Sequence, residues 1–67
     1  MRLTKRERQI VILIGRGWTN RQIAHKLGTA ERTVKNQLTT IYAKCGVSNR
    51  VQLALRAHRK KMLTVST

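Results

Sequence analysis

Apolar residues recur at helical spacing in four segments of the chain, and capping residues mark where these segments begin. The first apolar run, residues 10–14, is Ile-Val-Ile-Leu-Ile and follows a capping-box pattern of Thr4 and Glu7. Such β-branched residues also suit a buried strand. The capping box and the lack of a partner strand favour a helix, which Gly15 and Gly17 are expected to end.

A second capping box, Thr19 with Gln22, predicts a short helix that ends at Gly28. Its apolar side is formed by Ile23, Ala24 and Leu27. Trp18 directly precedes the cap, so we expect it to pack on the following turn and not to stack on a base.

Residues 31–45 predict an amphipathic helix with two distinct sides. At about 100° per residue, the apolar side contains Val34, Leu38, Ile41 and Cys45. The opposite, polar side contains Arg32, Lys35, Asn36 and Thr39, together with the small Ala43. Only residues 28–30 separate this helix from the one before it, and two helices joined by a short glycine-containing turn form a helix-turn-helix.

A fourth helix is expected after Gly46, with Ser48 as its cap. The side expected to face the core contains Val51, Ala54, Leu55, His58 and Met62. Leu53 and Ala57 lie off that side and predict an exposed apolar strip. We therefore expect an all-α, compact four-helix domain with a central helix-turn-helix. It forms a single domain over residues 1–67, with its core at about 3–62 and a frayed tail at 63–67.

The charge of the chain is strongly one-sided, with 15 Lys and Arg against 2 Asp and Glu, a net charge of +13. Such a chain is attracted to a polyanion, either nucleic acid or an anionic membrane. The apolar run at residues 10–14 is far short of the roughly 20 residues that span a bilayer. We expect nucleic acid as the partner, no membrane, and a cytoplasmic location, which the single Cys45 also suits.

Catalysis and metal binding are not expected. The acids are Glu7 and Glu31, and one of them belongs to a capping box, so no Ser–His–acid set is available. His25, His58 and Cys45 stand at scattered spacings that do not suit a metal site. We expect no enzyme and no cofactor.

The start of the second helix is a predicted phosphate site. Exposed backbone N–H groups and the positive end of the helix dipole favour an anion beside Thr19, Asn20 and Arg21.

A set of residues at fixed spacing runs through most of the chain. It consists of Leu3-Thr4 with Arg6-Glu7, Gly17, the run from Thr19 to Ala24, Leu27, Thr33-Val34-Lys35, Lys44 with Gly46-Val47, and Arg50. With these residues the chain resembles, over about residues 3–57, the LuxR-type (GerE- or NarL-like) helix-turn-helix domain, a four-helix DNA-binding module of bacterial transcription regulators.

Four positions depart from the family pattern. Thr29 and Ala30 replace an aliphatic residue and a capping serine, so we expect Thr29 to cap the third helix and to start it one residue earlier. Gln37 replaces a frequent histidine and can still donate to a phosphate. Cys45 replaces a leucine and is expected to be a small buried hydrophobe.

The resemblance implies sequence-specific binding of double-stranded DNA, with the helix at about residues 31–45 in the major groove. It places base-reading contacts at Arg32, Lys35, Asn36 and Thr39. It places further DNA-backbone contacts at Thr33, Gln37, Lys44 and Arg50. A homodimer on DNA would form through the fourth helix, with Leu53 and Ala57 as contacts. The protein would act on nucleoid DNA, with RNA polymerase as a further partner.

Other interpretations remain open at this point. A small RNA-binding or ribosome-associated protein would have the same size and charge. Proteins that bind single-stranded RNA usually present stacking aromatic side chains on their binding surface. In this chain the aromatics Trp18 and Tyr42 both lie off the polar side of the third helix. An interaction module that docks an acidic partner and the promoter-reading domain of a sigma factor are further alternatives. The chain is either a whole small regulator or the DNA-binding C-terminal fragment of a larger response regulator.

Overall fold

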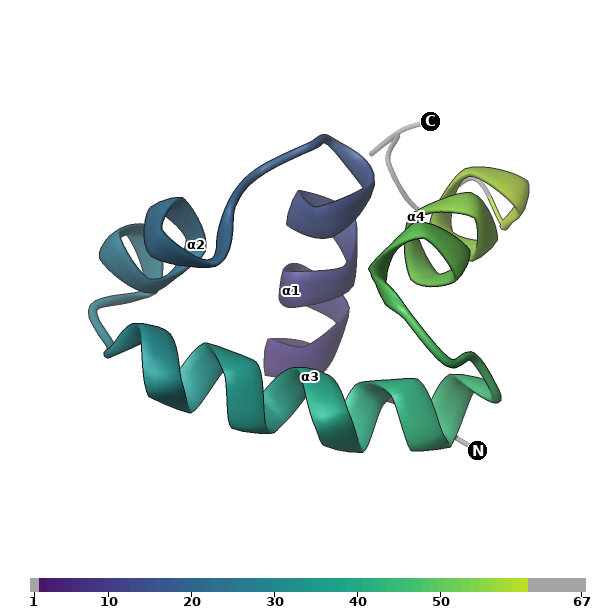
Figure 1. The fold of residues 1–67 in the computed structure, drawn as a ribbon, viewed down its shortest axis with the longest axis horizontal. Helices are drawn as coiled ribbons and strands as arrows, with labels where there is room; N and C mark the ends of the chain where they lie inside the picture. Colours follow the sequence, from purple (N-terminus) through teal and green to yellow (C-terminus); the bar gives the residue numbers. More distant parts are fainter. Residues whose placement is uncertain (1, 61–67) are drawn as a thin grey trace.

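The computed structural model describes residues 2–60 and contains four helices within them. These are α1 (Lys5–Gly15), α2 (Asn20–Leu27), α3 (Glu31–Cys45) and α4 (Arg50–Arg59). In Figure 1, α1 stands between α2 and α4, and α3 runs across the lower edge of the molecule. The predicted all-α, four-helix architecture and its central helix-turn-helix, α2 followed by α3, are confirmed. The predicted frayed tail at 63–67 and Met62 lie outside the described residues.

Each helix contributes at least one large, fully buried side chain to a shared core. These side chains include Ile10, Ile23, Ile41 and Leu53, all with an exposed fraction of 0%. Burying an aliphatic side chain of this size stabilises the fold by roughly 1.5–3 kcal/mol. Because each of the four helices supplies such a side chain, all four are held together by the same core. The run at residues 10–14 is helical and packs against this core, which confirms the helix over the strand.

Both predicted capping boxes are present. The backbone N–H of Glu7 donates to Thr4 Oγ1 over 3.1 Å, and that of Thr4 donates to Glu7 Oε1 over 2.8 Å. Thr19 and Gln22 form the same pair of bonds at 3.1 and 2.8 Å. These reciprocal bonds fix where α1 and α2 begin.

Glycine ends α2 and α3 in the same way. Gly28 and Gly46 adopt the left-handed conformation, with φ of 69° and 68°. The next residue then donates back into the helix, from Thr29 N–H to the Ala24 carbonyl over 2.9 Å and from Val47 N–H to the Tyr42 carbonyl over 3.0 Å. This is the Schellman arrangement, and it confirms the two helix ends predicted at these glycines.

Two predicted caps are wrong. Ala30, and not Thr29, is the N-cap of α3, and it makes no side-chain cap bond. Thr29 stands one residue before this cap, and its backbone N–H belongs to the end of α2, where it donates to the Ala24 carbonyl. At α4 the N-cap is Asn49, whose side chain accepts from Gln52 N–H over 2.9 Å. Ser48 takes part only through its backbone N–H, which donates to Gln52 Oε1 over 2.6 Å.

The predicted core-facing side of α4 is correct for Ala54, which is half-buried against the core, but wrong for Val51 and Leu55. Leu53 and Ala57 have an exposed fraction of 0%, whereas Val51 and Leu55 are 67% and 56% exposed. Leu53 and Ala57 stand one helical turn apart and both belong to the core, and α4 packs against α1. The prediction that Leu53 and Ala57 form an exposed dimer strip is therefore wrong, because both are used inside the monomer.

Candidate nucleic-acid interface

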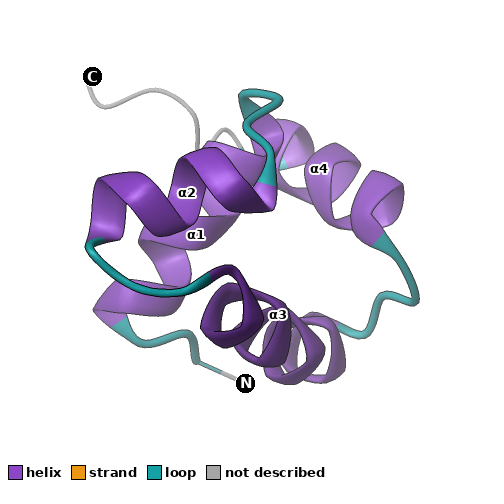
Figure 2. Cartoon of the chain, turned by 60° about the vertical axis from the view of Figure 1, so that its left-hand side comes forward, coloured by secondary structure: helices purple, strands orange, loops and turns teal. Residues whose placement is uncertain are grey.

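The polar side of α3 is exposed as predicted, while its apolar side is buried. Val34, Leu38 and Ile41 are at most 3% exposed. The four predicted base-reading side chains are all exposed: Arg32, Lys35, Asn36 and Thr39. Figure 2 shows α3 along one edge of the molecule, as in Figure 1. The structure thus brings these four side chains together on one outward surface.

One member of this surface is tied to its own helix. Thr39 Oγ1 donates to the carbonyl of Lys35 over 3.3 Å, one turn earlier. This bond uses the hydroxyl proton, so the hydroxyl lone pairs and the methyl group remain for an external contact.

The predicted backbone-contact residues divide into two groups by exposure. Thr19, Arg21 and Thr33 are exposed. Asn20, Gln37, Lys44 and Arg50 are half-buried. Within the second group, Asn20, Lys44 and Arg50 form hydrogen bonds inside the protein that compete with a contact to a phosphate.

Arg50, at the start of α4, forms hydrogen bonds with residues at the start of α2. Its Nη1 donates to Asn20 Oδ1 over 2.6 Å, and its Nη2 donates to the carbonyl oxygen of Trp18. Trp18 itself is half-buried and packs against the core, in agreement with its predicted structural role. The guanidinium thus fixes both sides of the Thr19 cap. Sequence reasoning missed this contact because 30 residues separate the two partners.

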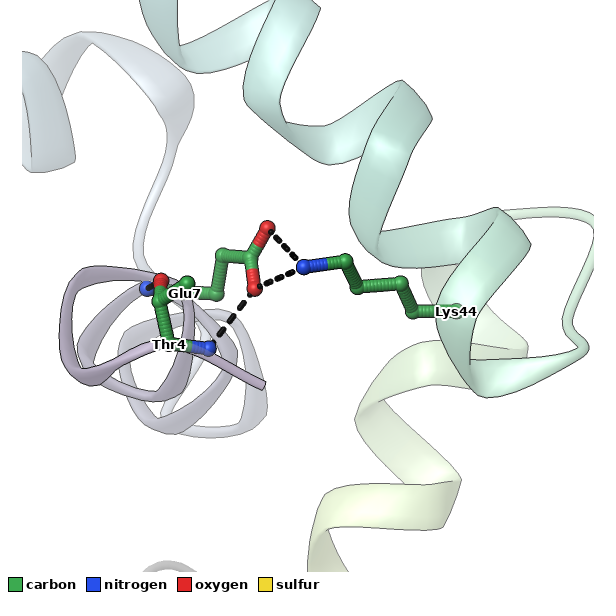
Figure 3. A network of polar contacts seen from close by, with 3 residues as sticks. All are labelled: Thr4, Glu7 and Lys44. Carbon is green, nitrogen blue, oxygen red and sulfur yellow. Dashed lines mark hydrogen bonds and ion pairs between the residues drawn. The ribbon is translucent and has the colours of Figure 1, made fainter. Parts of the chain in front are cut away.

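Lys44 pairs with Glu7, as Figure 3 shows. Lys44 Nζ lies 2.8 Å from Glu7 Oε1 and 3.0 Å from Oε2, and Oε1 also accepts from Thr4 N–H. The Lys44 ammonium, followed by the Thr4 backbone N–H, lowers the pKa of the Glu7 carboxyl from its ordinary value. The pair joins the start of α1 to the end of α3 and so holds the third helix in place.

Gln37 is turned toward the protein. Its Oε1 is buried and has no hydrogen-bond partner within the described part of the chain. Cys45 is half-buried and packs against the core, so it is less enclosed than predicted, and Leu27 is half-buried against the core as well. Between residues 2 and 60 no three His, Cys, Asp or Glu side chains meet as a metal site. Over the same residues no helix has the length and apolar character needed to cross a membrane.

A short α2, a glycine turn and an α3 with an outward polar surface define a helix-turn-helix protein. The family described as bacterial regulatory proteins of the luxR family matches residues 1–57. The chain therefore belongs to the luxR family, which confirms the resemblance in the sequence.

The curated relatives are regulators that are longer than this chain. The chain is 44% identical over 61 residues to the transcriptional regulatory protein LiaR of Bacillus subtilis, covering 91% of the chain and 29% of that protein. It is 46% identical over 56 residues to the probable transcriptional regulatory protein SgaR of Hyphomicrobium methylovorum, covering 84% and 26%. It is 42% identical over 59 residues to the DNA-binding transcriptional activator DevR/DosR of Mycobacterium tuberculosis, covering 88% and 27%. The chain thus spans less than a third of the length of these relatives.

Proposed function

We propose that this chain binds double-stranded DNA sequence-specifically, as the DNA-binding domain of a bacterial transcription regulator, with α3 in the major groove. The observation that carries this proposal is the outward surface of α3. It presents two cations, an amide and a hydroxyl, and the opposite side of the same helix is anchored in the core. A helix fixed in this way can present its donors to base edges without rearrangement.

Each side chain on this surface has a suitable base partner. Lys35 donates to N7 and O6 of guanine, and Asn36 pairs with N6 and N7 of adenine. Thr39 offers its methyl group to a thymine methyl. Arg32 lies in the first turn of α3, where it reaches either a base edge or a phosphate.

The DNA backbone is contacted from the start of α2. The first N–H groups of a helix have no partner within the helix and attract a phosphate, and the exposed Arg21 adds a cation beside them. Thr33, at the start of α3, is a second exposed donor. Lys44 and Arg50 act mainly by holding α3 and α2 in position, and the spare donors of Arg50 and the amide nitrogen of Gln37 supplement these contacts.

A homodimer on DNA forms through α4, with Val51 and Leu55 in place of the buried Leu53 and Ala57. These are the large hydrophobic residues that the described chain exposes. With a charge of +13 on each copy, two free copies repel one another until DNA neutralises them. The regulator would act in the cytoplasm on nucleoid DNA and together with RNA polymerase, without catalytic activity of its own.

Selection of bound duplexes from a random library tests this function. The expected result is an enriched half-site of a few base pairs, repeated with two-fold symmetry about one helical turn apart. A pool that remains random after several rounds would show that the chain binds duplexes by charge alone. Preferential enrichment of RNA in a parallel selection would instead support the RNA-binding alternative.

A further inference from the structure

A pocket of about 360 Å³ lies where the start of the chain, α1, the end of α3 and α4 meet. We call it the basic pocket, after the cations in its lining: Arg2, Arg8, Lys44, Arg56 and Lys60. Lys44 is neutralised by Glu7. Within residues 2–60 the other four have no ion pair. The basic pocket therefore concentrates positive charge that no carboxylate of the described chain balances.

The floor of the basic pocket is apolar. It consists of Leu3, Val11, Cys45 and Leu53. Leu3 and Cys45 are half-buried, so part of this floor remains accessible, while Val11 and Leu53 belong to the core. Cations above a poorly polarisable floor attract an anion more strongly than the same cations surrounded by water.

The basic pocket faces away from the proposed base-reading surface. Cys45 lies on the buried side of α3, in line with Leu38 and Ile41, and Lys44 reaches back toward α1 (Figure 3). The exposed Lys35 and Asn36 occupy the opposite side of the same helix. An occupant of the basic pocket therefore leaves the outward surface of α3 free.

We propose that the basic pocket binds an acidic peptide segment of a partner protein. Two or more carboxylates contact the cationic rim, and one aliphatic side chain between them rests on the apolar floor. Charge complementarity carries this assignment, because a carboxylate relieves the repulsion among Arg2, Arg8, Arg56 and Lys60. The apolar floor favours a peptide over a DNA backbone, since phosphodiesters bring no apolar side chain to cover it. This binding site is separate from the proposed DNA contact and does not depend on it.

A labelled peptide tests the chemistry of the basic pocket directly. The probe is a fluorescein-labelled Glu-Glu-Leu-Glu-Glu peptide, titrated with the 67-residue chain at about 0.1 M salt and followed by fluorescence anisotropy. Saturable binding is expected. A Glu-Glu-Ser-Glu-Glu peptide of equal charge should bind about fivefold more weakly, because it covers no apolar floor. Equal binding of the two peptides would overturn the proposal.

A matched pair of variants tests the location. Arg8→Glu reverses a charge in the lining, and Arg6→Glu makes the same change on an exposed residue of α1 outside it. We expect about a tenfold loss of peptide affinity for Arg8→Glu and at most about a twofold loss for Arg6→Glu. Equal losses would mean a general charge attraction and would overturn the proposal. If thermal melting shows that Arg8→Glu does not fold, Arg56→Gln with Arg59→Gln as its control gives the same comparison.

Duplex binding by the same variants separates a peptide site from a DNA site. Arg8→Glu and Arg6→Glu should weaken duplex binding to a similar extent. A far larger loss of duplex binding for Arg8→Glu, with peptide affinity unchanged, would assign the basic pocket to the DNA backbone and overturn the proposal. Because the peptide titration contains no DNA, its result does not depend on whether the proposed DNA-binding function is correct.

Discussion

Arg50 and Asn20 are the first residues of α4 and α2, and a hydrogen bond of 2.6 Å from Arg50 Nη1 to Asn20 Oδ1 joins the two helix starts. Arg50 also donates to the carbonyl of Trp18, so a single guanidinium holds the segment that carries the Thr19 cap. The start of α2 is the proposed phosphate site, and α4 carries the proposed dimer surface. Arg50 therefore connects the two surfaces that must act together on DNA.

Replacing Arg50 with alanine should lower both stability and DNA affinity. The change leaves Asn20 and Trp18 without a charged donor, and a hydrogen bond to a charged group contributes about 1.5–3 kcal/mol. In a domain of this size, each kcal/mol corresponds to about 4–8 °C in melting temperature. Arg50→Lys should recover only part of the loss, because an ammonium lacks the planar fork that serves two acceptors. An unchanged melting temperature in Arg50→Ala would contradict the conclusion that Arg50 stabilises the start of α2.

Lys35→Ala should weaken binding to the selected duplex by about 1–3 kcal/mol and relax the preference at one base pair. The measurement is the affinity for the selected site and for its single-base variants. Arg21→Ala serves as the control for backbone contacts. It should weaken all duplexes alike and reduce the salt slope by about 0.9. A uniform loss with Lys35→Ala would move Lys35 from base reading to phosphate contact.

Acid should destabilise the fold through Glu7. Its pKa is lower in the folded chain than the ordinary value of 4.5, because Lys44 and the Thr4 N–H stabilise the carboxylate. The resulting stability is fully present above pH 4.5 and is lost as the pH falls through the lower, folded pKa. Melting temperatures measured from pH 7 to pH 3 should fall in the acidic range. Glu7→Gln should be less stable at pH 7 and show a smaller acid dependence than the parent chain.

Ile23→Ala should destabilise the fold by about 2–5 kcal/mol, because Ile23 is fully buried where α2 packs on the core. Leu27→Ala, at a half-buried position of the same helix, should cost less. Chemical denaturation of both variants gives the comparison. Equal costs would mean that Leu27 is as enclosed as Ile23.

Leu55→Gln should impair the proposed pairing of two copies on DNA without unfolding the monomer, since Leu55 is 56% exposed. Binding to a two-fold symmetric duplex should lose cooperativity, while binding to a single half-site should not change. Leu53→Ala makes the contrasting change on the same helix and should lower the melting temperature. Unaltered cooperativity in Leu55→Gln would exclude this surface as the dimer contact.

The starts of α1 and α2 and the ends of α2 and α3 could be predicted because their signals are local, whereas the predicted caps of α3 and α4 were wrong. Thr4 with Glu7, and Thr19 with Gln22, specify their caps within four residues, and Gly28 and Gly46 close helices through their own backbone conformation. The two sides of α3 could also be predicted, since polar and apolar residues are cleanly separated along it. The outward position of Lys35 and Asn36 followed from that pattern.

The orientation of α4 could not be predicted, because apolar residues occupy more than one side of it. Packing of α4 against the rest of the fold, α1 above all, decides between the sides, and it buries Leu53 and Ala57 while leaving Leu55 exposed. The contacts of Lys44 and Arg50 could not be predicted either, because their partners Glu7 and Asn20 are 37 and 30 residues away in the sequence. A sequence motif identified both cations as important but did not show that each is used to join helices.

Ala30 leaves the first turn of α3 without a side-chain acceptor, although this turn is the part of the proposed recognition helix that would enter the groove first. A serine in its place would stabilise a helix by about 1 kcal/mol, so the free protein forgoes that stability. The first N–H groups of α3 have no partner within the helix, and in the proposed complex they would donate to an oxygen of the nucleic acid. Part of the free energy needed to order this helix end would then be recovered only when DNA is bound. A substitution at Ala30 that makes the free helix more rigid would therefore raise the stability of the protein and lower its affinity for DNA.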